Sequence, residues 1–472
     1  MERSRRGFLG RIGLGAAAWV ASRKAAAQER ASDVAPGRVH TPHLAKLSYR
    51  TEGGVKVFEL VAQVVKREFL PGKVVDVWGF NGSMPGPTIE VNEGDRVRIL
   101  FRNELPEVTT PHWHGLEVPI EMDGVPAISQ PLVEPGGTYT YEFTLHQHGT
   151  FFYHSHMAMQ QMMGMIGMFI VHPRVPYRPA VEKDFGLILQ EWAILPNNTV
   201  PNSLSMEFNW LTMNGKAGPA ISPLIVKLGE RVRIRFVNLG MDHHPMHLHG
   251  NTFVVTGTEG GRIPDTQWFP GNTVLVGVAQ SRNVEFEATH PGDWMLHCHL
   301  PHHMMNQMVS MVGPMAQAGH GMPTGLGMEA GMGMVRGDQA LSEHLGPSLG
   351  RATGLAAAET RASNAVGQPD TAQSPAAGSH DGHVTPPADA KRVPGYPQDM
   401  WMTMDDAVAR PETHGMAPGW TGAMMGMMTV VRVLPPARYA DVMARVRGAG
   451  PEQGPEPRPD EHRHGGPAEG ES

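Results

Sequence analysis

The sequence predicts an all-β protein that contains two β-sandwich domains. Short runs of alternating valine, isoleucine, phenylalanine and tyrosine, separated by glycine, proline and asparagine, extend over residues 47–175, a pattern typical of β-sandwiches and barrels. The same pattern returns over residues 180–315. The chain has 472 residues, and at roughly 150 residues per domain this length allows two such domains and additional segments.

The two β-rich stretches are copies of one domain. Three pairs of segments match: residues 94–103 with 229–238, 112–115 with 247–250, and 149–156 with 292–299. The first two pairs share one shift of 135 residues. The copies differ at a position that bears on chemistry, because Ser155 stands where the second copy has Cys298.

Residues 1–27 predict a signal peptide rather than a part of the fold. Residues 4–9, Ser-Arg-Arg-Gly-Phe-Leu, form a twin-arginine pattern, followed by an apolar stretch over residues 12–20 and three alanines at 25–27. The apolar stretch is shorter than the roughly 20 residues that span a bilayer, and no later segment reaches that length, so we expect no membrane span. We therefore expect a periplasmic protein, or one otherwise exported through the twin-arginine pathway.

The segments after residue 315 have a different character. Residues 316–394 are rich in methionine, glycine and alanine without apolar periodicity, so we expect a flexible insertion that cannot bury a core. Residues 395–436 are expected to pack back on the core, with a strand over residues 427–434. The tail over residues 448–472 is rich in proline, glutamate and glycine and is expected to be disordered.

Composition argues against one class of partner and draws attention to three residue types. The net charge is -7 and no stripe of lysine and arginine is visible, which argues against a nucleic-acid partner. The chain holds 32 methionines and 25 histidines but a single cysteine, Cys298. One cysteine cannot form an intramolecular disulfide, so Cys298 is either a buried structural thiol or a functional one.

Histidines recur in His-x-His pairs more often than chance predicts. Random placement would give roughly one such pair, and the sequence holds six. Two of them, at residues 146–148 and 462–464, have no counterpart in the other copy and are set aside. Four remain, two in each copy at matching positions: His112 with His114, His154 with His156, His247 with His249, and His297 with His299.

Pairs with this spacing suit metal binding. Residues i and i+2 of a strand project from one face about 6 to 7 Å apart, so both imidazoles can reach one metal ion or two adjacent ones. Hydrogen-bonded histidines in a core or on a surface would explain a single pair equally well. Four pairs in register across a duplication favour a compact copper cluster built by eight histidines from two domains.

The second copy adds the pattern of a blue-copper site. Cys298 is followed five residues later by His303 and ten residues later by Met308, and His244 precedes all three. These residues supply two imidazoles, a thiolate and a weak axial thioether. Because alternate strand residues face opposite ways, Cys298 points to one copper and its two neighbouring histidines point to another, and the backbone between them is a short path for electrons.

Four motifs together resemble the copper motifs of the multicopper oxidases in order and spacing: residues 112–115, 154–156, 244–250 and 297–308. With the Gly-Pro-Thr-Ile segment at 86–89, the resemblance covers residues 48–315. It implies two cupredoxin-like Greek-key sandwiches and four coppers per chain. It also implies an enzyme that takes single electrons from a reductant at a type-1 copper and reduces dioxygen to water at a trinuclear cluster.

The resemblance further implies a ligand for each copper. The type-2 copper would be held by His112 and His247. One type-3 copper would be held by His114, His154 and His299, and the other by His156, His249 and His297. The type-1 copper would be held by His244, Cys298, His303 and Met308, and Cys298 would pass the electrons on.

Only about 90 residues separate His156 from His244, which leaves no room for a middle domain. The chain is therefore similar to two-domain oxidases such as the small laccases, with the type-1 site in the second domain. In those proteins the cluster forms between domain 1 of one subunit and domain 2 of the next, in a ring of three. Heterologous contacts close into rings when the rotation allows, so we expect a homotrimer with the cluster at subunit interfaces.

Oxygen reduction also needs protons at the cluster. Asp123 matches the family's acidic residue near the type-2 copper, and we favour a role in proton delivery over a turn-capping role before Gly124. Several three-domain relatives have a glutamate immediately before the second type-1 histidine. Here that position is His302, so the sequence leaves the identity of the proton donor open.

Methionines gather within residues 157–168, 322–334 and 424–428. Thioethers suit Cu(I), and they also fill cores. For the first group, packing is at least as good an interpretation. For residues 322–334, in a glycine-rich stretch, we favour Cu(I) capture and hence a cuprous-oxidase or copper-tolerance role. The sequence does not choose among a phenol, an aromatic amine and Cu(I) as the reductant.

Two other functions compete with this interpretation. A copper-containing nitrite reductase also has two cupredoxin domains, but it keeps its type-1 His-Cys-His motif in the first domain and needs fewer cluster histidines, so Ser155 argues against it. A non-catalytic periplasmic protein for copper binding or tolerance would need only the methionine-rich segments. It would leave Cys298 and the ordered motifs without a purpose.

Overall fold

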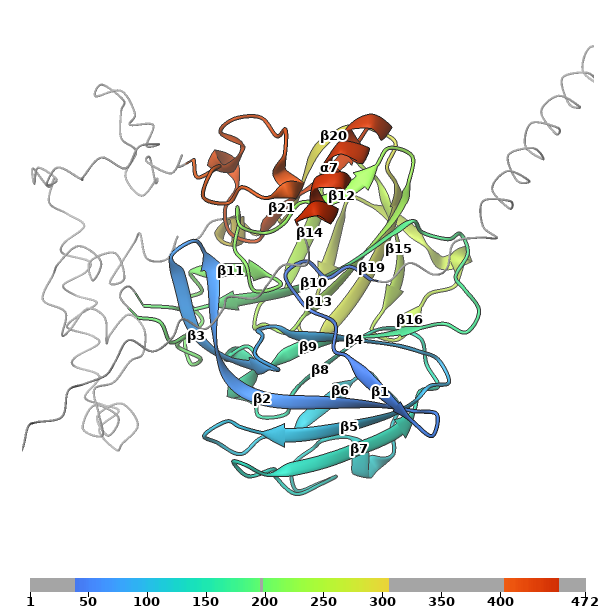
Figure 1. Cartoon of the computed structure of the whole chain (residues 1–472), viewed down its shortest axis with the longest axis vertical. Coiled ribbons are helices and arrows are strands. Elements are labelled where there is room, and N and C mark those ends of the chain that lie inside the picture. Colours follow the sequence, from blue (N-terminus) through green and yellow to red (C-terminus); the bar gives the residue numbers. More distant parts are fainter. Residues whose placement is uncertain (1–38, 196–197, 305–402, 450–472) are drawn as a thin grey trace, which may run out of the picture.

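The computed structural model describes residues 39–195, 198–304 and 403–449, and these consist mostly of β-strands (Figure 1). The all-β prediction is confirmed, because the strands form four sheets, two in each of two stacked domains. The predicted signal over residues 1–27, the insertion over residues 316–394 and Met308 lie outside the described residues. So does the chain beyond residue 449.

The first domain is a sandwich of two sheets. One sheet has the order β1 (Tyr49–Glu52), β2 (Val55–Leu70), β5 (Arg96–Asn103) and β7 (Thr138–Thr144), with β3 (Lys73–Phe80) also paired to β2. The other has the order β4 (Gly86–Asn92), β9 (Ile166–His172), β8 (Gly149–Ser155) and β6 (Pro111–His114). Along β5, Val97, Ile99 and Phe101 are buried and alternate with more exposed residues, because successive side chains of a strand point to opposite faces.

The second domain repeats this plan and adds strands at its edges. Its larger sheet has the order β11 (Trp210–Met213), β10 (Lys183–Trp192), β13 (Arg231–Asn238), β19 (Gln280–Glu287), β15 (Phe253–Thr258) and β16 (Gly261–Arg262), with β17 (Phe269–Gly271) on β15. The other has the order β12 (Leu224–Lys227), β21 (Met428–Leu434), β20 (Gly292–Cys298), β14 (His244–Leu248) and β18 (Thr273–Val276). A strand from the C-terminal segment, β21, therefore lies inside the second domain, parallel to β12 and antiparallel to β20.

Helices are short and lie outside the sheets. They are η1 (Ile120–Met122), α2 (Ala158–Met162), η2 (Asp265–Gln267), η3 (Pro301–Met304), η6 (Pro411–Thr413), η7 (Trp420–Ala423) and α7 (Pro436–Gly448). The sequence patterns did not predict α7, which lies beside β12 (Figure 1). Val442 of α7 packs against Ile225 and Leu434. Within residues 39–195, 198–304 and 403–449, no helix is long and apolar enough to cross a bilayer.

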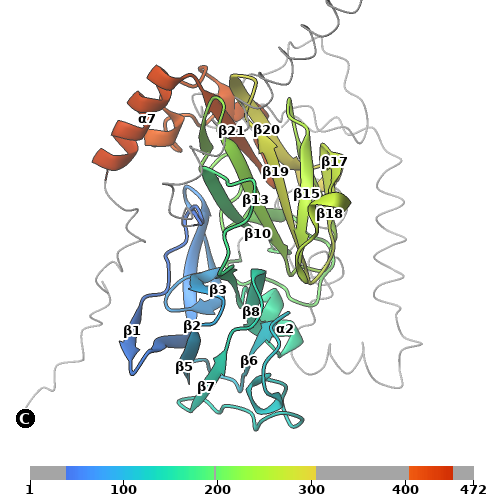
Figure 2. The same ribbon diagram turned by 90° about the vertical axis from the view of Figure 1, so that its right-hand side faces the viewer.

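The two domains pack face to face (Figure 2). Apolar residues of β8 and β9 join residues of β10 and β13 in one buried cluster. Thr150 of the first domain donates a hydrogen bond to Asn283 (2.9 Å) and accepts one from Arg235 (2.7 Å), and Arg235 is itself paired with buried Asp184. Buried polar contacts of this kind fix how the domains sit against each other.

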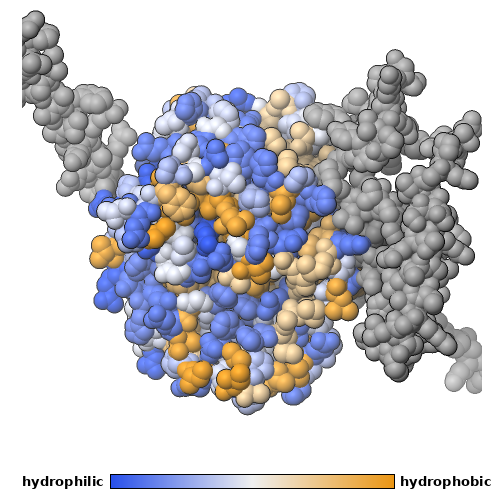
Figure 3. Space-filling model, turned by 180° about the vertical axis from the view of Figure 1, so that it is seen from behind, coloured by the Kyte–Doolittle hydropathy of each residue, from blue (hydrophilic) through white to orange (hydrophobic). Residues whose placement is uncertain are grey.

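The surface is mixed rather than uniformly polar. On the face seen in Figure 3, hydrophobic residues lie in several separate groups among hydrophilic ones.

Candidate metal centres

His244, Cys298 and His303, here called the type-1 triad, converge inside the second domain. β14 begins at His244, β20 ends at Cys298, and η3 carries His303. The sulfur of Cys298 lies 3.7 Å from His244 Nδ1 and 3.5 Å from His303 Nδ1, and the two nitrogens are 3.1 Å apart. All three side chains are buried. Two imidazole nitrogens and one sulfur at these separations fit the trigonal donor set of a blue-copper site.

Carboxylates hold the far ring nitrogens of both triad histidines. His244 Nε2 lies 3.1 Å from Glu191 Oε2, and His303 Nε2 lies 3.3 Å from Asp242 Oδ2. A ring that donates from Nε2 keeps Nδ1 free to bind a metal. Glu191 is fully buried, whereas the side chain of Asp242 is 39% exposed. The triad thus has one side closed by protein and one side near solvent.

Burial affects the two ionisable partners of this site differently. Burial raises the pKa of Glu191, but hydrogen bonds from His244 and from the amides of Met241 and Asp242 outweigh it, and the pKa lies below its ordinary value. Glu191 is therefore ionised at neutral pH. Burial raises the pKa of the Cys298 thiol to about 12, so a thiolate at this position needs a bound cation, whose binding would release the proton.

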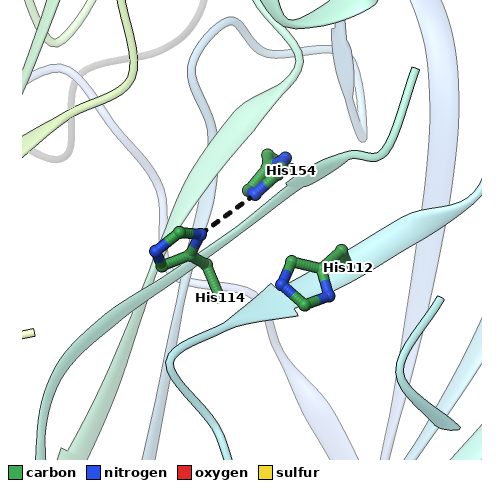
Figure 4. A group of neighbouring side chains, drawn as sticks. All are labelled: His112, His114 and His154. Atoms are coloured by element: carbon green, nitrogen blue, oxygen red, sulfur yellow. Dashed lines mark hydrogen bonds between the residues drawn. The ribbon is translucent and has the colours of Figure 1, made fainter. Parts of the chain in front are cut away.

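The first domain gathers four predicted histidines, the first-domain cluster: His112, His114, His154 and His156. The register of β6 and β8 pairs His112 with His154. One ring nitrogen of each of His112, His114 and His154 lies within 4.8 Å of the others, and His114 Nδ1 lies 3.3 Å from His154 Nε2 (Figure 4). The His156 ring lies 5.4 Å from the His112 ring, centroid to centroid.

The second domain gathers the matching four, the second-domain cluster: His247, His249, His297 and His299. The register of β14 and β20 pairs His247 with His297. Ring nitrogens of His247, His249 and His297 lie within 4.8 Å of one another, and His249 Nε2 lies 3.1 Å from His297 Nε2. The rings of His299 and His247 are 5.4 Å apart. The duplication seen in sequence is thus a duplication of site geometry.

Backbone carbonyls orient half of these rings. Four histidines donate a hydrogen bond from Nδ1: His112 to the carbonyl of Asp123 (2.7 Å), His247 to that of Asn272 (2.8 Å), His154 to that of Ser155 (2.8 Å) and His297 to that of Cys298 (2.9 Å). This bond fixes the tautomer and leaves Nε2 free for a metal.

Burial also keeps several cluster imidazoles neutral. It lowers the pKa of His114 to about 4 and that of His154 to about 3, with repulsion from neighbouring histidines acting in the same direction. The same two causes lower the pKa of His249 and His297. A neutral imidazole is the form that binds metals, so these four histidines, two in each cluster, are in the binding form near pH 7.

The two clusters do not meet within one chain. Among the residues that the structure describes, no hydrogen bond, ring contact or ligand group joins a histidine of one cluster to a histidine of the other. Their strands lie in different sheets, β6 and β8 in one and β14 and β20 in another. His156 and His299 are exposed. One chain therefore presents the first-domain cluster and the second-domain cluster as two separate groups of histidines.

Asp123 lies beside the first-domain cluster. Its carbonyl accepts the His112 hydrogen bond, its carboxylate Oδ1 lies 3.4 Å from the same nitrogen, and its side chain is 28% exposed. The carboxylate is thus accessible to solvent next to a candidate ligand. His302, at the other position considered for proton delivery, is exposed.

Two residues of the site, Asp242 and Glu191, are not predicted by the sequence motifs. Asp242 lies two residues before His244, so an acidic residue beside a ligand motif could have been noticed. Glu191 lies 53 residues before His244, on β10, and no motif marks it. Its role becomes visible only when β10 and β14 are placed together.

Comparisons with known proteins agree with this geometry. Family models described as multicopper oxidase match residues 62–176 and 195–315, together half of the chain. Copper resistance protein A homolog of Pseudomonas syringae pv. tomato is 34% identical over 151 residues, which cover 32% of this chain and 25% of that protein. Laccase-2 of Botryotinia fuckeliana is 30% identical over 237 residues, 45% of this chain and 40% of that protein.

A solved structure supports the same relationship. The blue copper oxidase from Nitrosomonas europaea superposes with a TM-score of 0.50 at 31% identity, covering 53% of this chain and 81% of that one. The chain matches a quarter or less of the length of the copper resistance proteins. Two matched domains, the duplicated histidine clusters and the buried type-1 triad converge on one conclusion: this chain belongs to the multicopper oxidase family.

Proposed function

We propose that the protein is an oxidoreductase that oxidises a reductant by single electrons and reduces dioxygen to water. The observation that carries the proposal is the buried type-1 triad, with the histidines of the second-domain cluster flanking Cys298 in sequence. Copper would supply one-electron exchange at the triad and oxygen reduction at a trinuclear site, with one type-1, one type-2 and two type-3 coppers per chain. Each turnover consumes four electrons, four protons and one dioxygen and yields two waters.

The chain itself provides the connection between the two sites. Met246 is paired with Cys298 and His247 with His297, so the triad cysteine and the cluster histidine are neighbours that face opposite sides of β20. His297 donates its Nδ1 hydrogen to the carbonyl of Cys298 at 2.9 Å. Covalent bonds and one hydrogen bond therefore link the sulfur to the cluster over a single residue.

Electrons are proposed to enter at His303 rather than at His244. His244 has no exposed surface, and its outer nitrogen faces Glu191, which is also fully buried. His303 faces Asp242, whose side chain reaches solvent. A reductant can therefore approach the triad through Asp242, which would also attract a cationic substrate.

The separation of the two histidine clusters within one chain supports a ring of three subunits. In this ring the first-domain cluster of one chain meets the second-domain cluster of the next. Large apolar side chains are exposed beside both. Ile120 (64% exposed) and Ile128 (79%) flank Asp123, while Leu275 (56%) lies on β18 beside β14. Exposed apolar groups near an open polar site are typical of an interface. A head-to-tail contact between unlike surfaces closes into a ring when the rotation allows.

Cu(I) is the reductant best supported among a phenol, an aromatic amine and Cu(I). Met304 follows His303 and packs in one cluster with Met424, Met428 and two further methionines. Thioethers are soft donors that suit Cu(I), and relatives are named copper resistance proteins.

Export through the twin-arginine pathway is proposed from residues 4–9 alone.

One set of measurements tests these proposals. The copper-loaded full chain should contain four coppers per subunit, absorb strongly in the blue-copper band and consume dioxygen with a reducing dye. It should sediment as a trimer, and an active monomer with full copper would refute the ring. Four coppers without oxygen uptake would instead favour the non-catalytic copper-binding alternative.

A further inference from the structure

The duplication identifies a residue of the type-1 site that its sequence motif does not contain. In the first domain, the amide of Ser155 donates to the carbonyl of Met165 (3.1 Å), and the amide of Met165 donates to the carbonyl of Gln160 (3.3 Å). Ser155 occupies the position of Cys298, and Gln160, five residues later, occupies that of His303.

The second domain repeats these two hydrogen bonds with a residue from the C-terminal segment. The amide of Cys298 donates to the carbonyl of Met427 (3.0 Å), and the amide of Met427 donates to the carbonyl of His303 (2.8 Å). Met427 therefore bridges the backbone of two triad residues. It occupies the position that Met165 occupies in the first domain.

Sequence and sheet order support the same correspondence. Met-Met-Gly-Met occurs at residues 162–165, immediately before β9, and again at residues 424–427, immediately before β21. β9 lies between β4 and β8, and β21 lies between β12 and β20. Because β20 is the counterpart of β8, β21 is the counterpart of β9.

The register directs the Met427 side chain toward the triad. His297 is paired with Met428, so the preceding residue, Met427, stands opposite Cys298, and opposite residues in a ladder project to the same face. Met427 has no exposed surface and belongs to the same core cluster as Cys298 and Met246. Met428 faces the other way and packs in a different cluster.

We propose that Met427, rather than Met308, is the axial ligand of the type-1 copper. This inference rests on the proposed function, because it assumes that the triad holds copper. The site is then assembled from three stretches far apart in the chain, at His244, at Cys298 with His303, and at Met427. The alternative for Met427 is plain core packing, since thioethers also fill apolar cores.

Substitutions that preserve volume separate these alternatives. The axial donor tunes the reduction potential of a blue-copper site. Met427→Leu removes the fourth donor, and a copper held by three donors favours the reduced ion, so the type-1 potential should rise. Met427→Gln supplies a harder oxygen donor, so the potential should fall and the electron paramagnetic resonance spectrum should change. Met165→Leu, at the corresponding position of the first domain, and Met308→Leu should leave both readouts unchanged.

The measurement is a redox titration of the blue band in the copper-loaded full chain, with copper counted in each variant. Opposite shifts in the two Met427 variants, with none in Met308→Leu, support the inference. Shifts of one sign in both Met427 variants, no shift in either, or a shift in Met308→Leu would overturn it. A wild-type protein without a blue band would instead remove the proposed function, and this inference with it.

Discussion

Replacing Glu191 by glutamine is predicted to weaken copper binding at the type-1 triad. Glu191 Oε2 faces His244 Nε2 at 3.1 Å, while Oε1 accepts from the amides of Met241 and Asp242. Glutamine keeps one acceptor oxygen and replaces the other with an amino group. Either the imidazole or the two amides must then face a donor. If the imidazole adapts, it moves its hydrogen to Nδ1, the nitrogen that faces Cys298, and loses its metal-binding form.

The magnitude follows from the burial of this contact. Losing a partner that orients a metal-binding histidine typically costs about ten- to a hundredfold in metal affinity, or about 1.4 to 2.8 kcal/mol. Glu191 has no exposed side-chain surface, so water cannot replace the lost acceptor. We therefore expect the upper half of that range.

The assay is competition for copper against a chelator, followed through the blue band. Glu285→Gln is the matched control, because Glu285 is also a fully buried glutamate of the second domain but pairs with Arg231, Arg233 and Arg262 rather than with a triad histidine. The control should keep its copper affinity. Wild-type affinity in Glu191→Gln, or equal losses in both variants, would refute the reasoning.

Three further outcomes are expected. Cys298→Ser should abolish the blue band while the histidine clusters keep their copper; a remaining band would contradict the assignment of the thiolate. Asp123→Asn should keep all coppers, because its bond to His112 is made by the backbone, yet lose about a hundredfold or more in oxygen turnover; full turnover would reject the proton-delivery role. Burial alone would raise the pKa of Glu285, but its arginine partners outweigh burial and lower the pKa from 4.5 to about 2. A shift of this size corresponds to about 3 kcal/mol of stability. That contribution is present above pH 4.5 and is lost as pH falls toward 2. Denaturant unfolding should therefore show that Glu285→Gln has a lower free energy of unfolding than wild type at pH 7, and that this difference closes in acid. A difference that does not change with pH would contradict the assigned direction of the pKa shift.

Sequence patterns could predict the fold class because the relevant signals are local. Alternation along a strand such as β5 depends on neighbouring residues, and the two copies of the domain reinforce each other. The His-x-His pairs are equally local, which is why the four histidines of each predicted group lie together in the structure. Their ligand roles remain predictions.

Contacts between distant segments could not be predicted in this way. Glu191 reaches His244 only because β10 and β14 lie in facing sheets of one sandwich. Met427 reaches Cys298 because β21 inserts between β12 and β20, although Met308 has the spacing that the motif requires. Spacing along the chain indicates candidate ligands within one loop, and it gives no sign of a residue that sheet pairing brings in from another segment.

The first domain shows what the same backbone does without the predicted ligands of a type-1 site. Thr109 and Ser155 stand at the positions of His244 and Cys298, and their hydroxyl oxygens lie 3.1 Å apart. The hydroxyl of Ser155 donates to Gln160 Oε1 (2.8 Å), and Gln160 Nε2 donates to the carbonyl of Val108 (2.9 Å). These neutral groups satisfy one another through hydrogen bonds, and neither a hydroxyl nor a side-chain amide is a soft metal donor. The duplication therefore provides two similar backbone frames, and within the described part of the chain it is the second frame that carries the two imidazoles and the thiol of a blue-copper donor set. This argues for a single point of electron entry per chain and against a nitrite-reductase arrangement, which would need the type-1 site in the first domain.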